Sequence, residues 1–164
     1  MVSVRKASRP RVCCAAFRAV ATNCAVLAGA AAVDPALNGA ALALALVLFL
    51  WTPPHFWSLA IAYRPDYEAA RVPMLPVVVG DARCARIILA NTVLLVAASL
   101  LPLAFGLGWL YALAAGAGGA LFIAKGVALV CAPGRNAALA NFRASLVQLV
   151  LLLAGAMLDV ALGA

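Results

Sequence analysis

Charged side chains are scarce in this sequence: they make up 10% of its 164 residues, and only five residues are acidic. A soluble domain has about a quarter charged residues and about half apolar ones. Here 68% of the residues are hydrophobic, and the mean hydropathy is +1.11. This balance excludes a soluble globular domain. It predicts an all-α membrane protein, because the backbone groups of a chain in lipid have to be satisfied inside helices.

Patterns typical of metal centres and of nucleic-acid binding are also missing. The five cysteines show no metal-ligand spacing, and the sequence has a single histidine. The net charge of +7 comes from basic residues dispersed among loops, not from a basic stripe interleaved with aromatic side chains. We therefore expect no nucleic acid among the partners, since positive-inside anchoring in a membrane explains the basic residues more simply.

Long apolar runs are what the sequence has instead. A helix needs about 20 apolar residues to cross roughly 30 Å of hydrocarbon. Four runs are clear spans of a multi-pass transmembrane helical bundle: 35–62, 85–105, 109–131 and 138–160. Residues 12–33 are a weaker candidate for a fifth span, because Arg18 interrupts them.

The basic residues set the expected orientation of these spans, because loops rich in Lys and Arg remain in the cytoplasm. The turn at 106–108 has no charged residue, so we expect it on the side of the membrane opposite the cytoplasm. We predict that the loop at 63–84 is cytoplasmic. Four arginines lie in or beside it: Arg64, Arg71, Arg83 and Arg86.

The scarce polar and aromatic residues gather in one stretch, WTPPHFWSLAIAYRPDYEAARVPMLP, at 51–76. It holds the only histidine, two of the three tryptophans, two of the five acidic residues and five of the nine prolines. Pro53 and Pro54 remove two backbone donors where the helix nears the predicted cytoplasmic face, so we expect a kink there. Carbonyl groups freed in lipid need protein or water as partners, so we expect a cavity with a polar rim.

Two interpretations of these polar residues stay open from their chemistry alone. Trp, Tyr and His side chains are enriched at membrane interfaces, and His55 fits that interpretation as well as a functional one. Asp66 favours function, because a carboxylate beside tyrosines and arginines at the end of a span is able to hold a hard cation. Glu68 either shares that task or is solvated.

The string LFLWTPPHFWSLAIAYRPDYEAARVPMLPVV, at 48–78, resembles the signature loop of the protohaem IX farnesyltransferases, also called haem O synthases. These enzymes belong to the UbiA-like prenyltransferase superfamily. The resemblance continues with SLLPLAFGLGWLY at 99–111 and ALANFRASLVQLVLLLAGAMLD at 138–159, so it covers about 35–159. The form WTPPHFW is similar to bacterial members, which implies a bacterial cytoplasmic (inner) membrane.

The resemblance implies a prenyltransferase that moves a farnesyl group from farnesyl diphosphate to a vinyl group of haem b, giving haem O. It implies nine transmembrane helices around a cavity, and Mg²⁺ with the diphosphate as cofactor. A dry aromatic pocket suits the allylic carbocation. The resemblance assigns catalytic roles to Asp66 and Tyr67, metal binding to Asp66 and Glu68, diphosphate binding to Tyr63, Arg64 and Arg71, and the haem or prenyl pocket to His55, Phe56 and Trp57.

The sequence departs from the family's pattern at two places. Family members carry, in an earlier half, a loop of the form N-x-x-x-D-x-x-x-D that supplies the principal Mg²⁺ ligands, and this sequence has no such string. Arg71 stands where the family usually has Gly. The resemblance therefore implies half of a UbiA-like bundle at 35–164, preceded by an atypical basic segment at 1–34.

Two hypotheses follow for the function. The first is a truncated haem O synthase, inactive alone, whose partners are farnesyl diphosphate, haem b, the lipid bilayer and either a missing N-terminal half or a second copy. The second is a non-catalytic membrane protein that binds haem or a prenyl lipid, or aids oxidase assembly. A channel or transporter fragment is disfavoured, because we expect the polar residues to gather at one face and not to run through the spans.

Overall fold

The computed structural model describes residues 39–163 of the chain. The candidate span at 12–33 lies outside the described residues, as does the division at residue 34, and both stay predictions. Between residues 39 and 163 the chain forms helices and no strand. Four of these helices are long: α2 (Gly39–Ala62), α5 (Asp81–Ala98), α6 (Trp109–Cys131) and α7 (Arg135–Leu162).

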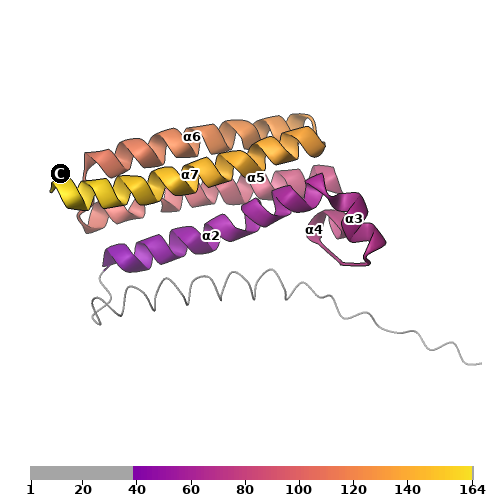
Figure 1. Cartoon of the computed structure of the whole chain (residues 1–164), viewed down its shortest axis with the longest axis horizontal. Coiled ribbons are helices and arrows are strands. Elements are labelled where there is room, and N and C mark those ends of the chain that lie inside the picture. The colour runs from indigo at the N-terminus through magenta and orange to yellow at the C-terminus, as the bar shows by residue number, and fades with distance from the viewer. Residues whose placement is uncertain (1–38, 164) are drawn as a thin grey trace, which may run out of the picture.

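The four long helices lie side by side in a bundle (Figure 1). Each is long and apolar enough to cross a membrane, when α5 is counted together with the 3₁₀ helix η1 (Leu101–Phe105) that follows it. The four predicted spans of a multi-pass helical bundle are therefore confirmed. α7 begins three residues before the expected 138, and ends before Gly163, whose φ of +64° suits glycine.

The short connections sort to the two ends of the bundle. Helices α3 (Arg64–Ala69) and α4 (Leu75–Val79) lie at the same end as the connection from α6 to α7, on the right in Figure 1. The C-terminus lies at the opposite end. Successive connections therefore lie at alternating ends of the bundle, as the distribution of basic residues predicts. The cytoplasmic placement of the loop at 63–84 stays a prediction.

Glycine allows α6 and α7 to pack closely. A Cβ atom at Gly118 would lie 3.1 Å from the Cα atom of Gln148, and one at Gly155 would lie 2.7 Å from the Cβ atom of Ala114. Small residues at such contacts are typical of helix association in membranes, where the backbones approach closely. Large apolar side chains such as Met157 instead point outward, as expected of a lipid-facing surface.

A buried carboxylate marks the start of α6. Asp159, near the end of α7, accepts a hydrogen bond from the backbone N–H of Gly108, the residue before α6. The first N–H groups of a helix have no partner within it, and a negative charge there also favours the helix dipole. Asp159 is 3% exposed. It therefore links the end of one span to the start of another inside the bundle.

The prolines of α2 do not end the helix, which runs from Gly39 through Pro53 and Pro54 to Ala62. Pro54 has no N–H to donate to the carbonyl of Leu50, four residues earlier. The side-chain nitrogen of Asn91 on α5 donates to that carbonyl at 2.8 Å instead. The freed carbonyl therefore has a protein partner, one of the two expected solutions, while the cavity beside it stays a prediction.

Candidate functional site

The single histidine lies in a stack of rings between α2 and α7. The ring of His55 is parallel to that of Trp51, with 4.2 Å between centroids, and to that of Phe142 on its other side, at 4.4 Å. The interplanar angles are 22° and 28°. Phe56 meets His55 edge-on at 5.3 Å. His55 is 8% exposed, so it is a buried group between two aromatic faces, while its depth in the membrane stays a prediction.

A serine on α7 sets the tautomer of this histidine. Ser145 Oγ lies 2.6 Å from the carbonyl oxygen of Phe142, and because a carbonyl cannot donate, the hydroxyl hydrogen lies on that bond. His55 Nδ1 is 2.7 Å from the same Oγ, so Nδ1 carries the hydrogen and Oγ accepts it. The lone pair of the neutral imidazole is then on Nε2. That atom is able to bind a metal or accept a proton.

The pocket residues predicted from the sequence divide into two groups. His55 and Phe56 contact each other, whereas Trp57 is half-buried and packs against a different core cluster, which includes Ile61 and Ile88. Sequence reasoning missed two members of the ring stack, Trp51 and Phe142. Trp51 Nε1 also donates to the carbonyl of Ser145 at 2.8 Å, which fixes α2 against α7 at this level.

Buried polar side chains continue along one face of α7. Asn141, Ser145, Gln148 and Asp159 are each at most 3% exposed, and their spacing of three, four or eleven residues keeps them on one face. Asn141 Nδ2 donates to Ser58 Oγ on α2 at 2.8 Å. The expectation that polar residues gather at one face of the membrane and do not run through the spans is therefore wrong. The spacing within the last apolar run was the signal that could have shown it.

Gln148 differs from the other members of this row, because neither atom of its side-chain amide has a hydrogen-bond partner in the described structure. Its side chain is fully buried. Burial of an unpaired amide costs about 1–3 kcal/mol. Such a group commonly marks a place where a bound water or a ligand completes the structure.

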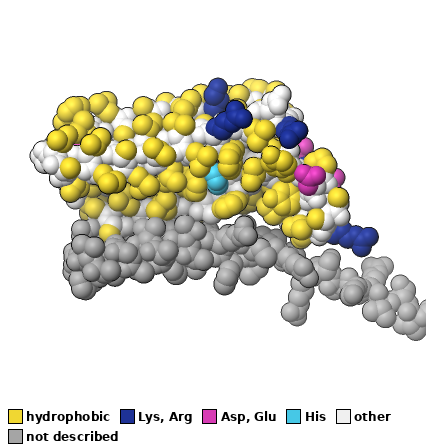
Figure 2. All heavy atoms as spheres, viewed as in Figure 1, with side chains coloured by type: hydrophobic (Ala, Val, Ile, Leu, Met, Phe, Trp, Pro, Cys, Tyr) yellow, Lys and Arg dark blue, Asp and Glu magenta, His cyan; other side chains and the backbone are white. Residues whose placement is uncertain are grey.

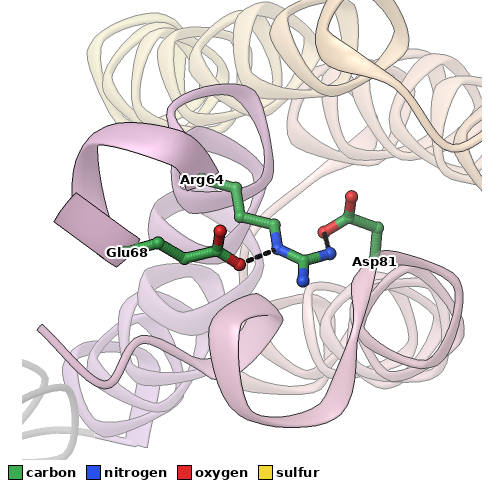
Figure 3. A network of polar contacts seen from close by, with 3 residues as sticks. All are labelled: Arg64, Glu68 and Asp81. Atoms are coloured by element: carbon green, nitrogen blue, oxygen red, sulfur yellow. Dashed lines mark hydrogen bonds and ion pairs between the residues drawn. The ribbon is translucent and has the colours of Figure 1, made fainter. Parts of the chain in front are cut away.

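In Figure 2 the acidic side chains lie at the end of the bundle that carries α3 and α4, while Lys and Arg side chains lie at this end and also further along the bundle, as far as the level of the histidine. There the guanidinium group of Arg64 lies between two carboxylates, one from α3 and one from the start of α5 (Figure 3). Its Nε donates to Glu68 Oε1 at 2.6 Å, and its Nη1 lies 3.2 Å from Asp81 Oδ1. The hydrogen bond to Glu68 and the charge of Asp81 raise the pKa of Arg64 above its usual value. Asp81 was not predicted, because nothing in its local sequence indicates that α3 folds back onto it.

The other predicted residues of this end are near one another along the chain but are not all in contact. Asp66 is exposed in the first turn of α3, and Tyr67 beside it is half-buried. Tyr63 is exposed, and the guanidinium of Arg135 lies over its ring, 5.5 Å from the centroid. Arg71 is exposed with a φ of +53°, a left-handed conformation that glycine adopts more easily. This conformation agrees with the expectation that relatives have Gly there.

The fit of these residues to Mg²⁺ is partial. Between residues 39 and 163, no group of three or more His, Cys, Asp or Glu side chains is placed to hold a metal ion. Glu68 is engaged by Arg64, whereas Asp66 is exposed. Mg²⁺ is commonly held by one or two carboxylates together with substrate phosphates and water. Asp66 fits such a role, with Glu68 as a second ligand if it leaves Arg64.

The sequence was compared with models of known protein families, and one family matches. The sequence model of the UbiA prenyltransferase family matches residues 7–149. The match includes most of the segment 1–34 that we set apart, so that division stays a prediction. No solved structure matches the chain.

Several curated proteins are similar to most of this chain. Protoheme IX farnesyltransferase 2 of Paramagnetospirillum magneticum is 62% identical over 135 residues, which are 82% of this chain and 47% of the relative. Protoheme IX farnesyltransferase 1 of the same organism is 57% identical over 129 residues, 78% and 46% of the two chains. Protoheme IX farnesyltransferase of Alkalilimnicola ehrlichii is 46% identical over 134 residues, which are 81% of this chain and 44% of the relative. The chain thus spans about half the length of the curated relatives it matches.

Proposed function

Because this chain belongs to the UbiA prenyltransferase family, we propose that it takes part in transfer of a farnesyl group from farnesyl diphosphate to a vinyl group of haem b. The names of its relatives, protoheme IX farnesyltransferases, indicate the farnesyl group and the haem acceptor. The observation that carries the proposal is the pairing of a buried ring stack around His55 with a charged cluster around Arg64. A substrate with an apolar chain and a diphosphate head needs both environments within reach of each other.

The distance between the two environments suits such a substrate. His55 lies seven residues before the end of α2 at Ala62, which corresponds to about 10 Å along the helix axis. Arg64 begins α3 directly afterwards. The prenyl chain would lie along α2 among apolar and aromatic side chains, and the diphosphate would lie at the charged end.

At the charged end, we propose that Tyr63, Arg64 and Arg71 bind the diphosphate. Asp66 and Glu68 would hold Mg²⁺, which, when bound, neutralises charge that develops on the leaving diphosphate. The guanidinium groups stabilise the same charge by hydrogen bonds and Coulomb attraction. We assign Tyr67 and Asp66 to the catalytic group, because they adjoin these residues on α3.

In the interior, we propose that His55 and Phe56 line the haem or prenyl pocket, with Trp57 at its edge. Aromatic faces near the reacting carbon favour a developing positive charge. The lone pair on His55 Nε2 supplies a ligand for haem iron or a proton acceptor. Exclusion of water by the apolar spans prevents hydrolysis of the allylic cation.

We also propose the setting of this activity. The chain would lie in a bacterial inner membrane with the loop at 63–84 in the cytoplasm, where soluble diphosphates are present. Its described residues supply few Mg²⁺ ligands, so we propose that activity requires further ligands from an N-terminal half of the family or from a second copy. A non-catalytic membrane protein that binds haem or a prenyl lipid is the alternative, favoured by the same shortage of ligands.

The test is production of haem O in a strain deleted for its own synthase. The 164-residue chain is expressed alone, and also together with the N-terminal half of the P. magneticum relative. We expect haem O only in the second case, since half-bundles associate through small residues in the spans. Haem O from the chain alone would show that its own ligands suffice, in one copy or in two copies together. No haem O in either case would favour the non-catalytic alternative.

A further inference from the structure

The ion pairs around Arg64 leave this cluster with a negative charge. One guanidinium group faces two carboxylates, Glu68 and Asp81, so the three side chains together carry one net negative charge. The carboxylates come from different elements, α3 and the first turn of α5. The third guanidinium nitrogen, Nη2, points away from both (Figure 3).

Each of the three side chains is partly exposed, although the Asp81 Oδ1 atom that faces Arg64 is itself buried. The exposed fractions are 33% for Arg64, 45% for Glu68 and 32% for Asp81. An anion that approaches Nη2 therefore meets one positive group whose charge is already balanced, and two negative groups within a few ångströms of it. The two carboxylates repel a bare diphosphate, because like charges at such distances disfavour binding.

A diphosphate accompanied by a divalent cation meets the same cluster differently. The cation lowers the negative charge of the ligand and attracts the carboxylates, while Nη2 donates to a phosphate oxygen. We propose that Asp81 is a specificity-determining residue, which, by balancing the charge of Arg64, makes this end of the bundle bind a cation-bound diphosphate in preference to the bare anion. The inference rests on the proposed function in taking Arg64 as a diphosphate-binding residue, and it adds Asp81 to that site.

Loss of the Asp81 charge and loss of the Asp66 charge should change diphosphate affinity in opposite directions. Asp66 has been proposed as a metal ligand, so its loss should weaken binding of the cation-bound form. Loss of the Asp81 charge removes a group that repels the diphosphate, and it frees Nη1 of Arg64 from its ion pair. It should therefore strengthen binding of the bare form, by about threefold to tenfold for one charge near a partly exposed site, and less at high salt.

The experiment measures equilibrium binding of farnesyl diphosphate to the full chain in detergent micelles by calorimetry, once with Mg²⁺ and once with a chelator. For Asp81→Asn we expect tighter binding in chelator, by the factor above, and a change of less than about twofold with Mg²⁺. Asp66→Asn serves as the comparison that removes an equal charge. We expect it to weaken binding with Mg²⁺ and to change binding in chelator less than Asp81→Asn does.

Two further variants make the outcomes separable. Asp81→Ser removes the charge but keeps a side chain that suits the start of a helix, so the same shift in this variant excludes misfolding of α5 as its cause. Arg64→Gln should weaken binding in both conditions. If Arg64→Gln changes nothing, or the chain binds neither form, the diphosphate site of the proposed function is wrong and the inference falls with it. If Arg64→Gln weakens binding and neither Asp81 variant tightens the bare form, only the inference is overturned.

Discussion

Around His55 the polar atoms are buried and hydrogen-bonded to one another between two spans, whereas around Arg64 the side chains are partly exposed and held by opposite charge at one end of the bundle. Within residues 39–163 the contacts of His55 are with a hydroxyl group and with aromatic rings, not with an ionised side chain, and the geometry of this region depends on ring stacking. The second depends on charge that salt and ligands modify. The region around His55 is therefore held in a fixed geometry, whereas the region around Arg64 is adaptable.

The two regions should respond differently to mutation. A change inside the bundle removes a contact that no solvent replaces, so its effect is large and independent of salt. A change at the charged end is partly compensated by water and ions, so its effect is smaller and depends on ionic strength.

His55→Phe should have the largest effect. It keeps a ring between Trp51 and Phe142 but removes Nε2, together with the Nδ1 that bonds to Ser145. We expect haem O production with the complementing half to fall by about 100-fold or more, as for loss of a group acting directly. The measurement is haem extraction and chromatography. Phe56→Leu, which alters a neighbouring ring without removing a lone pair, is the control and should cost less. Equal losses in both variants would contradict a specific role of Nε2.

Asp66→Asn should have the next largest effect. We expect a fall in turnover of about tenfold to 100-fold in the complemented enzyme, since a carboxylate ligand stabilises the metal as the diphosphate leaves. Glu68→Gln should lower turnover less, because Glu68 is shared with Arg64. The Mg²⁺ dependence of turnover is measured for both. Equal and small effects would return Asp66 to an interfacial, non-functional role.

Asn91→Leu should destabilise the bundle without touching the charged end. It leaves the carbonyl of Leu50 without a donor beside Pro54, at a cost of about 1–3 kcal/mol in the free energy of unfolding. The measurement is thermal unfolding in micelles. Asn136→Leu, at an exposed position on α7, is the matched control and should change stability little. If both variants have the same stability as the wild type, the hydrogen bond from Asn91 does not support α2.

Arg71→Gly should have the smallest effect and the opposite sign. The left-handed conformation at this residue costs a non-glycine side chain about 1 kcal/mol, so glycine should raise stability by roughly that amount. Ala70→Gly, at a φ of −77°, is the control and should lower stability slightly. The KM for farnesyl diphosphate is measured in parallel and should rise modestly, because a cationic group is lost. An unchanged or lower KM would exclude Arg71 from diphosphate binding.

The four spans could be predicted because hydropathy and helix length are properties of the local sequence. Asp81 could not be predicted as a partner of Arg64, because their contact depends on how α3 and α4 fold back between positions 64 and 81. Phe142 and Ser145 lie about 90 residues from His55 and are joined to it only by the packing of α7 on α2. Their spacing with Asn141 and Gln148 indicated a polar face, but not which helix that face meets.

The most direct test of the account is a pair of binding titrations on three forms of the chain: the wild type, His55→Phe and Arg64→Gln. Haem b is titrated by its absorbance spectrum, and farnesyl diphosphate with Mg²⁺ by calorimetry. We expect His55→Phe to lose haem binding and keep diphosphate binding, and Arg64→Gln to show the reverse. Loss of both ligands in either variant, or haem binding by His55→Phe at the wild-type affinity, would contradict the division into a buried haem end and a charged diphosphate end.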